Sequence, residues 1–155
     1  MKKKLLISSC LIGKNVKYNG SSNKLDDETL SSLEENFILI DFCPEVEGGL
    51  PTPRTPCEII SQNPLKIINK KGIDKTKEFT QGAKLTLDLC KKQDISISLL
   101  KANSPSCSSK YIYDGTFSSK KIEGLGITAQ LLKNNNITLY DEINIDKLFT
   151  DNVNN

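Results

Sequence analysis

Hydrophobic residues recur along the chain with two spacings, one typical of short buried strands and one typical of amphipathic helices. Apolar runs predict four strands, over residues 5–8, 37–42, 95–100 and 137–140. Apolar residues at helical spacing predict three helices and a last helical turn, over 26–36, 76–92, 126–134 and 145–149. Strands that alternate with helices are typical of a mostly parallel sheet covered by helices. We therefore expect a single-domain, three-layer α/β fold similar to a Rossmann fold over residues 1–150, and a disordered tail over 151–155.

Two segments interrupt the alternation of strands and helices. Pro44, Pro51, Pro53 and Pro56, together with two glycines, exclude regular structure from about Cys43 to Pro56 and predict a stiff loop. Loops of this length in compact domains are usually functional. Beyond this loop we expect a hairpin formed by 57–60 and 66–68, and later in the chain a long polar loop over 101–121.

Charge narrows the class of ligand. The 155 residues contain 21 Lys and Arg against 19 Asp and Glu, and this net charge of +2 is too small for a surface that contacts many phosphates of a long nucleic acid. We therefore expect a small-molecule substrate. The apolar run after Lys2-Lys3-Lys4 is too short for a signal peptide, and no apolar stretch approaches the roughly 20 residues of a membrane span. These features predict a cytoplasmic protein without a membrane partner.

The chain contains five cysteines and no histidine. In a reducing compartment, an odd and irregularly spaced set of cysteines indicates metal ligands, a nucleophile or core residues rather than disulfides. The absence of histidine excludes Ser-His and Cys-His catalytic pairs and histidine-containing zinc sites. Cys90 continues the apolar face of Phe79 and Ala83 on the helix over 76–92, and Cys57 lies on a predicted strand. Both are interpreted as core residues.

Cys10, Cys43 and Cys107 differ from these two because they lie among Ser, Gly and Pro, just after predicted strands. The carboxyl ends of parallel strands meet at one edge of a sheet, where ligands bind. The three thiols are therefore expected to converge on one metal centre. From the residues alone, structural zinc with Cys57 as a fourth ligand stays open, but an iron–sulfur cluster with three protein ligands suits an enzyme better because it leaves one iron open.

Three motifs around these cysteines resemble those of a known family. They are Ser8-Ser9-Cys10-Leu11-Ile12-Gly13, the run from Cys43-Pro44-Glu45 to Pro53-Arg54, and Ser104-Pro105-Ser106-Cys107 followed by Ile112-Tyr113-Asp114-Gly115-Thr116-Phe117. In this order they are similar to the thiouracil desulfidase family, also called domain of unknown function 523. The similarity extends over about residues 4–140.

The resemblance implies a [4Fe-4S] cluster bound by Cys10, Cys43 and Cys107. It also implies non-redox removal of sulfur from thiouracil or thiouridine nucleotides, which gives uracil or uridine compounds and hydrosulfide. The family's acid/base carboxylate corresponds to Glu45 and its assisting hydroxyl to Ser104. A carboxylate is a sensible proton carrier in a chain without histidine, because burial beside a ligand can raise its pKa.

Four further residues are candidates for substrate binding. Arg54 can bind a phosphate or a uracil carbonyl through its planar guanidinium, or can hold the proline-rich loop instead. Tyr18 can stack on a pyrimidine, and Lys101 and Asn103 can face the substrate, although ordinary surface positions explain these three as well. Two residues near the motifs depart from the family pattern without touching a proposed ligand: Asn19, where Asp is common, and Ser108, where Gly is common.

Two other functions are compatible with part of the pattern. A non-catalytic thiolate module that binds a metal or senses redox state would use the same cysteines without turnover. A cysteine phosphatase would need an Arg-containing phosphate loop shortly after its nucleophile, and neither Cys10 nor Cys43 is followed by one. The resemblance implies a thiolated pyrimidine base or nucleotide as the substrate, and the oligomeric state stays open.

Overall fold

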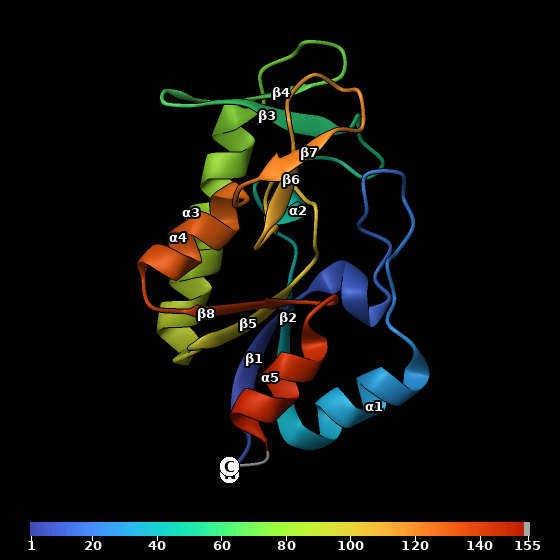
Figure 1. Ribbon diagram of the computed structural model, residues 1–155, viewed down its shortest axis with the longest axis vertical. Helices are drawn as coiled ribbons and strands as arrows, with labels where there is room; N and C mark the ends of the chain where they lie inside the picture. Colours follow the sequence, from blue (N-terminus) through green and yellow to red (C-terminus); the bar gives the residue numbers. More distant parts are fainter. Residues whose placement is uncertain (154–155) are drawn as a thin grey trace.

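A four-stranded parallel sheet with strand order β2-β1-β5-β8 forms the centre of the molecule (Figure 1). The computed structural model describes residues 1–153. The strands of the sheet are β1 (Lys3–Ser8), β2 (Phe37–Phe42), β5 (Ile97–Leu100) and β8 (Thr138–Asp141). All three neighbouring pairs run parallel. The predicted α/β class with a mostly parallel sheet is confirmed.

Helices cover both faces of this sheet, in three layers (Figure 1). The helices are α1 (Asp27–Asn36) and α5 (Ile145–Asn152) on one face, and α3 (Thr76–Gln93) and α4 (Ile127–Asn134) on the other. The pleat of β1 explains the arrangement, because successive side chains of a strand point to opposite faces. Leu5 and Ile7 pack in one core with Leu148 of α5, whereas Leu6 packs in the other with Leu132 of α4.

The strand order places a topological switch point beside β1. The next strand of the sheet after β2, which is β5, lies on the other side of β1. The chain makes this crossing through α3, which covers the opposite face of the sheet from α1. Loops that follow the strands on either side of a switch point diverge and leave a crevice at the carboxyl ends of the strands. The short 3-10 helix η1 (Ser9–Ile12), directly after β1, borders this crevice.

Two hairpins lie beyond the sheet, towards the top of Figure 1. They are built from β3 (Cys57–Gln62) with β4 (Leu65–Asn69), and from β6 (Tyr111–Tyr113) with β7 (Lys121–Glu123). A separate apolar core beneath them includes Ile59, Ile112 and Phe79 of α3. The Glu58 carboxylate accepts hydrogen bonds from the backbone N–H groups of Gly115 and Phe117, at 3.0 and 3.1 Å, and so connects the two hairpins.

Three details of the predicted fold are wrong. The proline-rich loop contains a short helix, α2 (Pro44–Glu47), because proline is well tolerated in the first turn of a helix. The predicted loop over 101–121 contains β6 and the start of β7, which pair with each other.

The third detail concerns the end of the chain. Helix α5 continues to Asn152, held by a 2.8 Å hydrogen bond from the Tyr140 hydroxyl to Asp151, so the expected tail does not begin at residue 151. Residues 154–155 of that tail lie outside the described residues. Within residues 1–153, no helix is long and apolar enough to cross a membrane.

Candidate metal centre and active site

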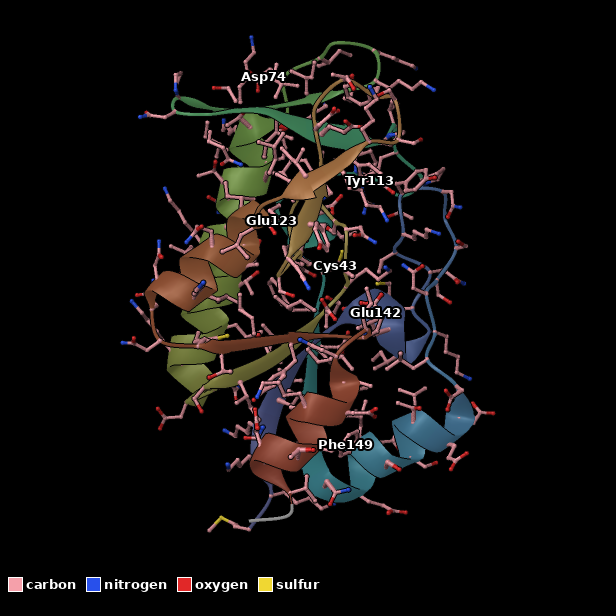
Figure 2. All side chains as sticks on the ribbon, viewed as in Figure 1. Cys43, Asp74, Tyr113, Glu123, Glu142 and Phe149 are labelled. Atoms are coloured by element: carbon pink, nitrogen blue, oxygen red, sulfur yellow. The ribbon has the colours of Figure 1, made fainter. Side chains whose placement is uncertain are left out.

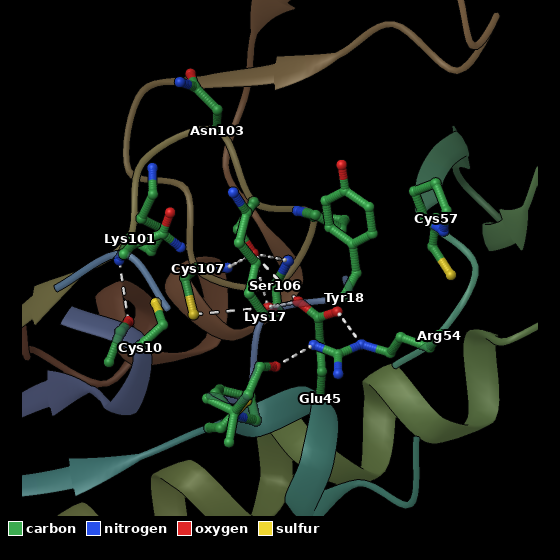
Figure 3. Close-up of a pocket in the computed structure, with 18 of the residues that line it drawn as sticks. Cys10, Lys17, Tyr18, Glu45, Arg54, Cys57, Lys101, Asn103, Ser106 and Cys107 are labelled. Atoms are coloured by element: carbon green, nitrogen blue, oxygen red, sulfur yellow. Dashed lines mark hydrogen bonds and ion pairs between the residues drawn. The ribbon is translucent and has the colours of Figure 1, made fainter. Parts of the chain in front are cut away.

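A cavity of about 480 Å³ lies at the carboxyl ends of β1, β2 and β5 (Figure 3). Cys10 reaches it from η1, Cys43 from the junction of β2 and α2, and Cys107 from the loop after β5. Cys43 lies near the middle of the molecule, between the hairpins and helix α5 (Figure 2). The three thiols, distant in sequence, therefore line one cavity, as the position of each after a parallel strand predicts.

The surroundings of the three thiols differ. Cys107 is buried, and the loss of water raises the pKa of its thiol to about 12. Cys10 and Cys43 are partly exposed, and burial raises the pKa of each thiol as well. Thiols with raised pKa values are protonated near neutrality, so binding of a metal by all three must release protons.

The donor set fits an iron–sulfur cluster. Each protein thiolate of such a cluster binds a different iron atom. Thiolates are its natural protein ligands. Three thiols around a cavity, without any histidine, match a cluster with three protein ligands.

Glu45 is held from two sides beside the cysteines (Figure 3). One carboxylate oxygen, Oε2, accepts hydrogen bonds from the hydroxyls of Ser106 at 2.8 Å and Ser104 at 3.3 Å. The other, Oε1, accepts from Nε of Arg54 at 3.2 Å. The Glu45 side chain is only 15% exposed. A carboxylate fixed in this way has one orientation relative to the cavity, as an acid/base group requires.

The hydroxyl of Ser104 organises the loop that carries Cys107. Its oxygen accepts hydrogen bonds from the backbone N–H groups of Ser106 and Cys107, both at 3.1 Å. The first turn of α4 holds the same loop, because the N–H of Thr128 donates to the Ser106 carbonyl at 2.9 Å. Since the lone pairs of the Ser104 oxygen are occupied by backbone donors, its own proton can be donated to the Ser106 oxygen at 2.9 Å or to Glu45 at 3.3 Å.

Arg54 is committed to protein groups. Its guanidinium donates to the carbonyls of Val16 at 2.9 Å and Pro51 at 3.2 Å, to the hydroxyl of Thr52 at 3.1 Å, and to Glu45. The Arg54 side chain is 7% exposed. This arrangement favours the alternative in which Arg54 holds the proline-rich loop over direct binding of a substrate phosphate.

The other three substrate-binding candidates also line the cavity. Tyr18 is exposed, and Asn103 adopts a positive φ of 64°. The ammonium group of Lys101 forms a 2.7 Å ion pair with Glu142, which lies between the hairpins and helix α5 (Figure 2). Burial raises the pKa of the Cys10 thiol, and the positive charge of Lys101 offsets part of this rise.

Sequence reasoning missed Ser106, Glu142 and the position of Cys57. Ser106 lies inside a recognised motif, and Glu142 directly follows β8, so the rule that placed the cysteines at strand ends could have found Glu142. Cys57 is only partly buried and lines the same cavity, which corrects its interpretation as a simple core residue. Cys90 is 1% exposed within the core between α3 and the sheet, as predicted.

Comparison with known proteins identifies the family. A family model described as 2-thiouracil desulfurase matches residues 5–144. The chain belongs to the 2-thiouracil desulfurase family. It is 43% identical over 136 residues to the uncharacterized protein YbbK of Bacillus subtilis (strain 168), a match that covers 83% of this chain and 89% of that one.

One solved structure is similar to this chain over almost its whole length. That structure is described as the [4Fe-4S]-dependent thiouracil desulfidase TudS, also called DUF523Vcz, and is 39% identical in sequence with a TM-score of 0.91. The match covers 97% of both chains. The family predicted from the three motifs is thus confirmed, and the predicted cluster agrees with the cofactor named for this relative.

Proposed function

We propose that this chain is a [4Fe-4S]-dependent desulfidase that removes sulfur from thiouracil or thiouridine nucleotides. The observation that carries the proposal is the presence of Cys10, Cys43 and Cys107 around one cavity, with Glu45 held beside them. Membership of the 2-thiouracil desulfurase family and the similarity to the thiouracil desulfidase TudS support it. Cys10, Cys43 and Cys107 would hold the cluster.

The reaction exchanges sulfur for oxygen without a change of oxidation state. One water is consumed, the C=S bond becomes C=O, and hydrosulfide and a proton are released. When bound, the cluster supplies an open iron that polarises the thiocarbonyl sulfur as a Lewis acid. Glu45 takes a proton from the attacking water, and its hydrogen bonds to Ser104 and Arg54 keep its carboxylate in place. The Ser104 hydroxyl orients that carboxylate and the water next to it.

The lining of the cavity suits a nucleotide as well as a free base. Lys17 and Lys70 line it, and neither ammonium group forms an ion pair within the part of the chain that the structure describes. Arg54, in contrast, is already engaged. A phosphate attached to the substrate would therefore meet two available positive charges. The phosphate of a small thiolated nucleotide can pair with these two charges, whereas a long nucleic acid would need many more positive charges.

The surroundings of the thiols favour a cytoplasmic location. All five cysteines are free thiols. A reducing compartment keeps thiols in this state and protects a cluster with an open iron.

Anaerobic reconstitution tests the proposal. The protein is reconstituted with iron and sulfide, its metal and sulfide are counted, and 2- and 4-thiouracil and their nucleotides are offered while hydrosulfide and uracil products are measured. We expect a [4Fe-4S] stoichiometry and hydrosulfide release. Bound zinc or no cluster would overturn the proposal, and a cluster without sulfur release would identify a metal-binding or redox-sensing module instead.

A pair of variants assigns the ligands. Cys43→Ala should lose the cluster, whereas Cys57→Ala should keep it. Cys57 is a matched control because its thiol lines the same cavity. Cluster loss in Cys57→Ala would show that this thiol is a ligand.

A further inference from the structure

Helix α2 packs directly on the backbone of helix α3. Cys43 caps the amino end of α2, and Glu45 lies in its first turn. A Cβ atom placed on Gly82 of α3 would lie 1.9 Å from the carbonyl oxygen of Pro44 and 2.7 Å from its carbonyl carbon. These distances are far shorter than van der Waals contact, and the obstructing atoms are backbone. No side chain therefore fits at Gly82 while α2 keeps its place.

The contact is reciprocal. A Cβ atom on Gly48, at the carboxyl end of α2, would lie 2.1 Å from the carbonyl oxygen of Glu78 and 2.9 Å from the nitrogen of Gly82. Each of the two glycines thus faces the backbone of the other helix. The spacing of the helices is set by two missing side chains rather than by interdigitated ones.

Glycine at position 82 is not explained by local conformation. Gly82 lies inside the 18-residue helix α3 and has no positive φ, so an alanine would suit its backbone. Glycine in a helix interior is less stable than alanine. The close approach of Pro44 is the feature that requires glycine here.

Of the two helices, α2 is the one that would move. Helix α3 is anchored in two apolar cores through residues such as Phe79 and Leu87. Helix α2 has four residues, of which only Pro44 is buried. A side chain at position 82 would therefore displace α2, together with Cys43 and Glu45, from Cys10 and Cys107, which lie on loops after other strands.

We propose that Gly82 is a positioning residue for the metal centre. With Gly48, it sets the separation of α2 and α3, and this separation places Cys43 and Glu45 relative to the other two thiols. The inference rests on the proposed function, since it assumes that these groups act together. It concerns neither a ligand nor a catalytic residue, because Gly82 touches the site only through α2.

Gly82→Ala tests the inference in the full chain. We expect unchanged far-ultraviolet circular dichroism, reduced iron and sulfide content after reconstitution, and a turnover lower by about 100-fold, as for a misplacement of about 1 Å. Gly48→Ala, which obstructs the same contact from α2, should behave alike. Lys84→Ala, on the exposed face of α3, should match wild type in all three measurements.

A second readout does not depend on the cluster. In the metal-free protein, alkylation followed by peptide mapping should show a changed labelling rate for Cys43 in Gly82→Ala, while the rate for Cys90 in the core stays as in wild type. Wild-type protein that assembles no cluster would defeat the proposed function, and this labelling would still decide the role of Gly82. Wild-type labelling and cluster content in a folded Gly82→Ala, or loss of folding in both glycine variants, would overturn the positioning role.

Discussion

The Ser106 hydroxyl donates a 2.8 Å hydrogen bond to the Glu45 carboxylate, across 61 positions of the chain. The same hydroxyl lies 2.9 Å from the oxygen of Ser104 and 3.6 Å from the sulfur of Cys107. Ser106 is buried, whereas Ser104 is partly exposed towards the cavity. Ser106 thus supports, from behind, the carboxylate and hydroxyl that we propose face the substrate.

Ser106→Ala should impair turnover without loss of the cluster. A hydrogen bond to a charged group contributes about 1.5–3 kcal/mol, so its removal from a positioned carboxylate should lower kcat by about 10- to 100-fold. Iron content and kcat, measured on the same preparation, check this expectation. Ser31→Ala, exposed on α1 and not among the residues that line the cavity, is a control of equal size change. A kcat equal to that of the wild type in Ser106→Ala would show that Ser106 does not position Glu45.

Glu45→Gln should separate cluster binding from catalysis. The amide keeps the size of the side chain but cannot take up the proton, so turnover should fall by about 10²- to 10⁴-fold, the usual contribution of a general acid or base. The visible spectrum of the cluster should persist. Glu47→Gln, on the exposed side of the same short helix, should retain full activity. Normal turnover in Glu45→Gln would end the acid/base assignment.

Arg54→Lys should weaken the proline-rich loop rather than the binding of phosphate. Lysine keeps the charge but lacks the planar fork that serves Glu45, Val16 and Pro51 together. We expect a loss of about 1–3 kcal/mol in the free energy of unfolding, measured with urea, and a lower kcat for bases and nucleotides alike. A rise in KM confined to nucleotides would instead make Arg54 a phosphate ligand.

Lys70→Ala, in contrast, should affect the binding of phosphate rather than the stability of a loop. If Lys70 receives the phosphate of a nucleotide substrate, KM should rise by about 10-fold for a thiolated nucleotide, the effect of about 1.4 kcal/mol, and stay unchanged for the free thiobase. Steady-state kinetics with both substrates measure the difference. Equal effects on the two substrates would show that Lys70 does not read the phosphate.

The sequence predicted elements best where one periodicity dominates. Strand β2 (Phe37–Phe42) matches its predicted range, and α3 (Thr76–Gln93) differs from its range by one residue, because both have long apolar patterns. Helix α2 was missed since its single turn begins with Pro44 in a proline-rich run. Strand β7 was missed because all three of its residues are exposed, so no buried face marks it.

The features of the candidate site likewise fall into those that the sequence predicts and those that it does not. The three thiols could be predicted because a rule about strand ends converts sequence positions into a shared edge of the sheet. The hydrogen bonds of Arg54 could not, because they depend on how the loop around Pro51 folds back towards Val16. The contact at Gly82 is likewise invisible in one sequence, where a glycine inside a helix only lowers the expected stability.

Cys90 should make the stability of the metal-free protein depend on alkaline pH. Burial in the core raises the pKa of its thiol from 9.0 to about 11. Above pH 9 the unfolded chain loses this proton while the folded protein keeps it until about pH 11. Deprotonation therefore stabilises the unfolded state, and the contribution present below pH 9 is lost as pH rises through this window.

The size of this effect follows from the shift in pKa. The difference between 9.0 in the unfolded chain and about 11 in the folded protein corresponds to about 2–3 kcal/mol at most. Urea unfolding of the reduced, metal-free protein at about pH 8 and about pH 11 should show a smaller loss of stability in Cys90→Ala than in wild type, by about that amount. Comparing the two pH values within each protein cancels the cost of the cavity that alanine leaves in the core. Equal losses in both proteins would mean that the Cys90 thiol titrates alike in the folded and unfolded states.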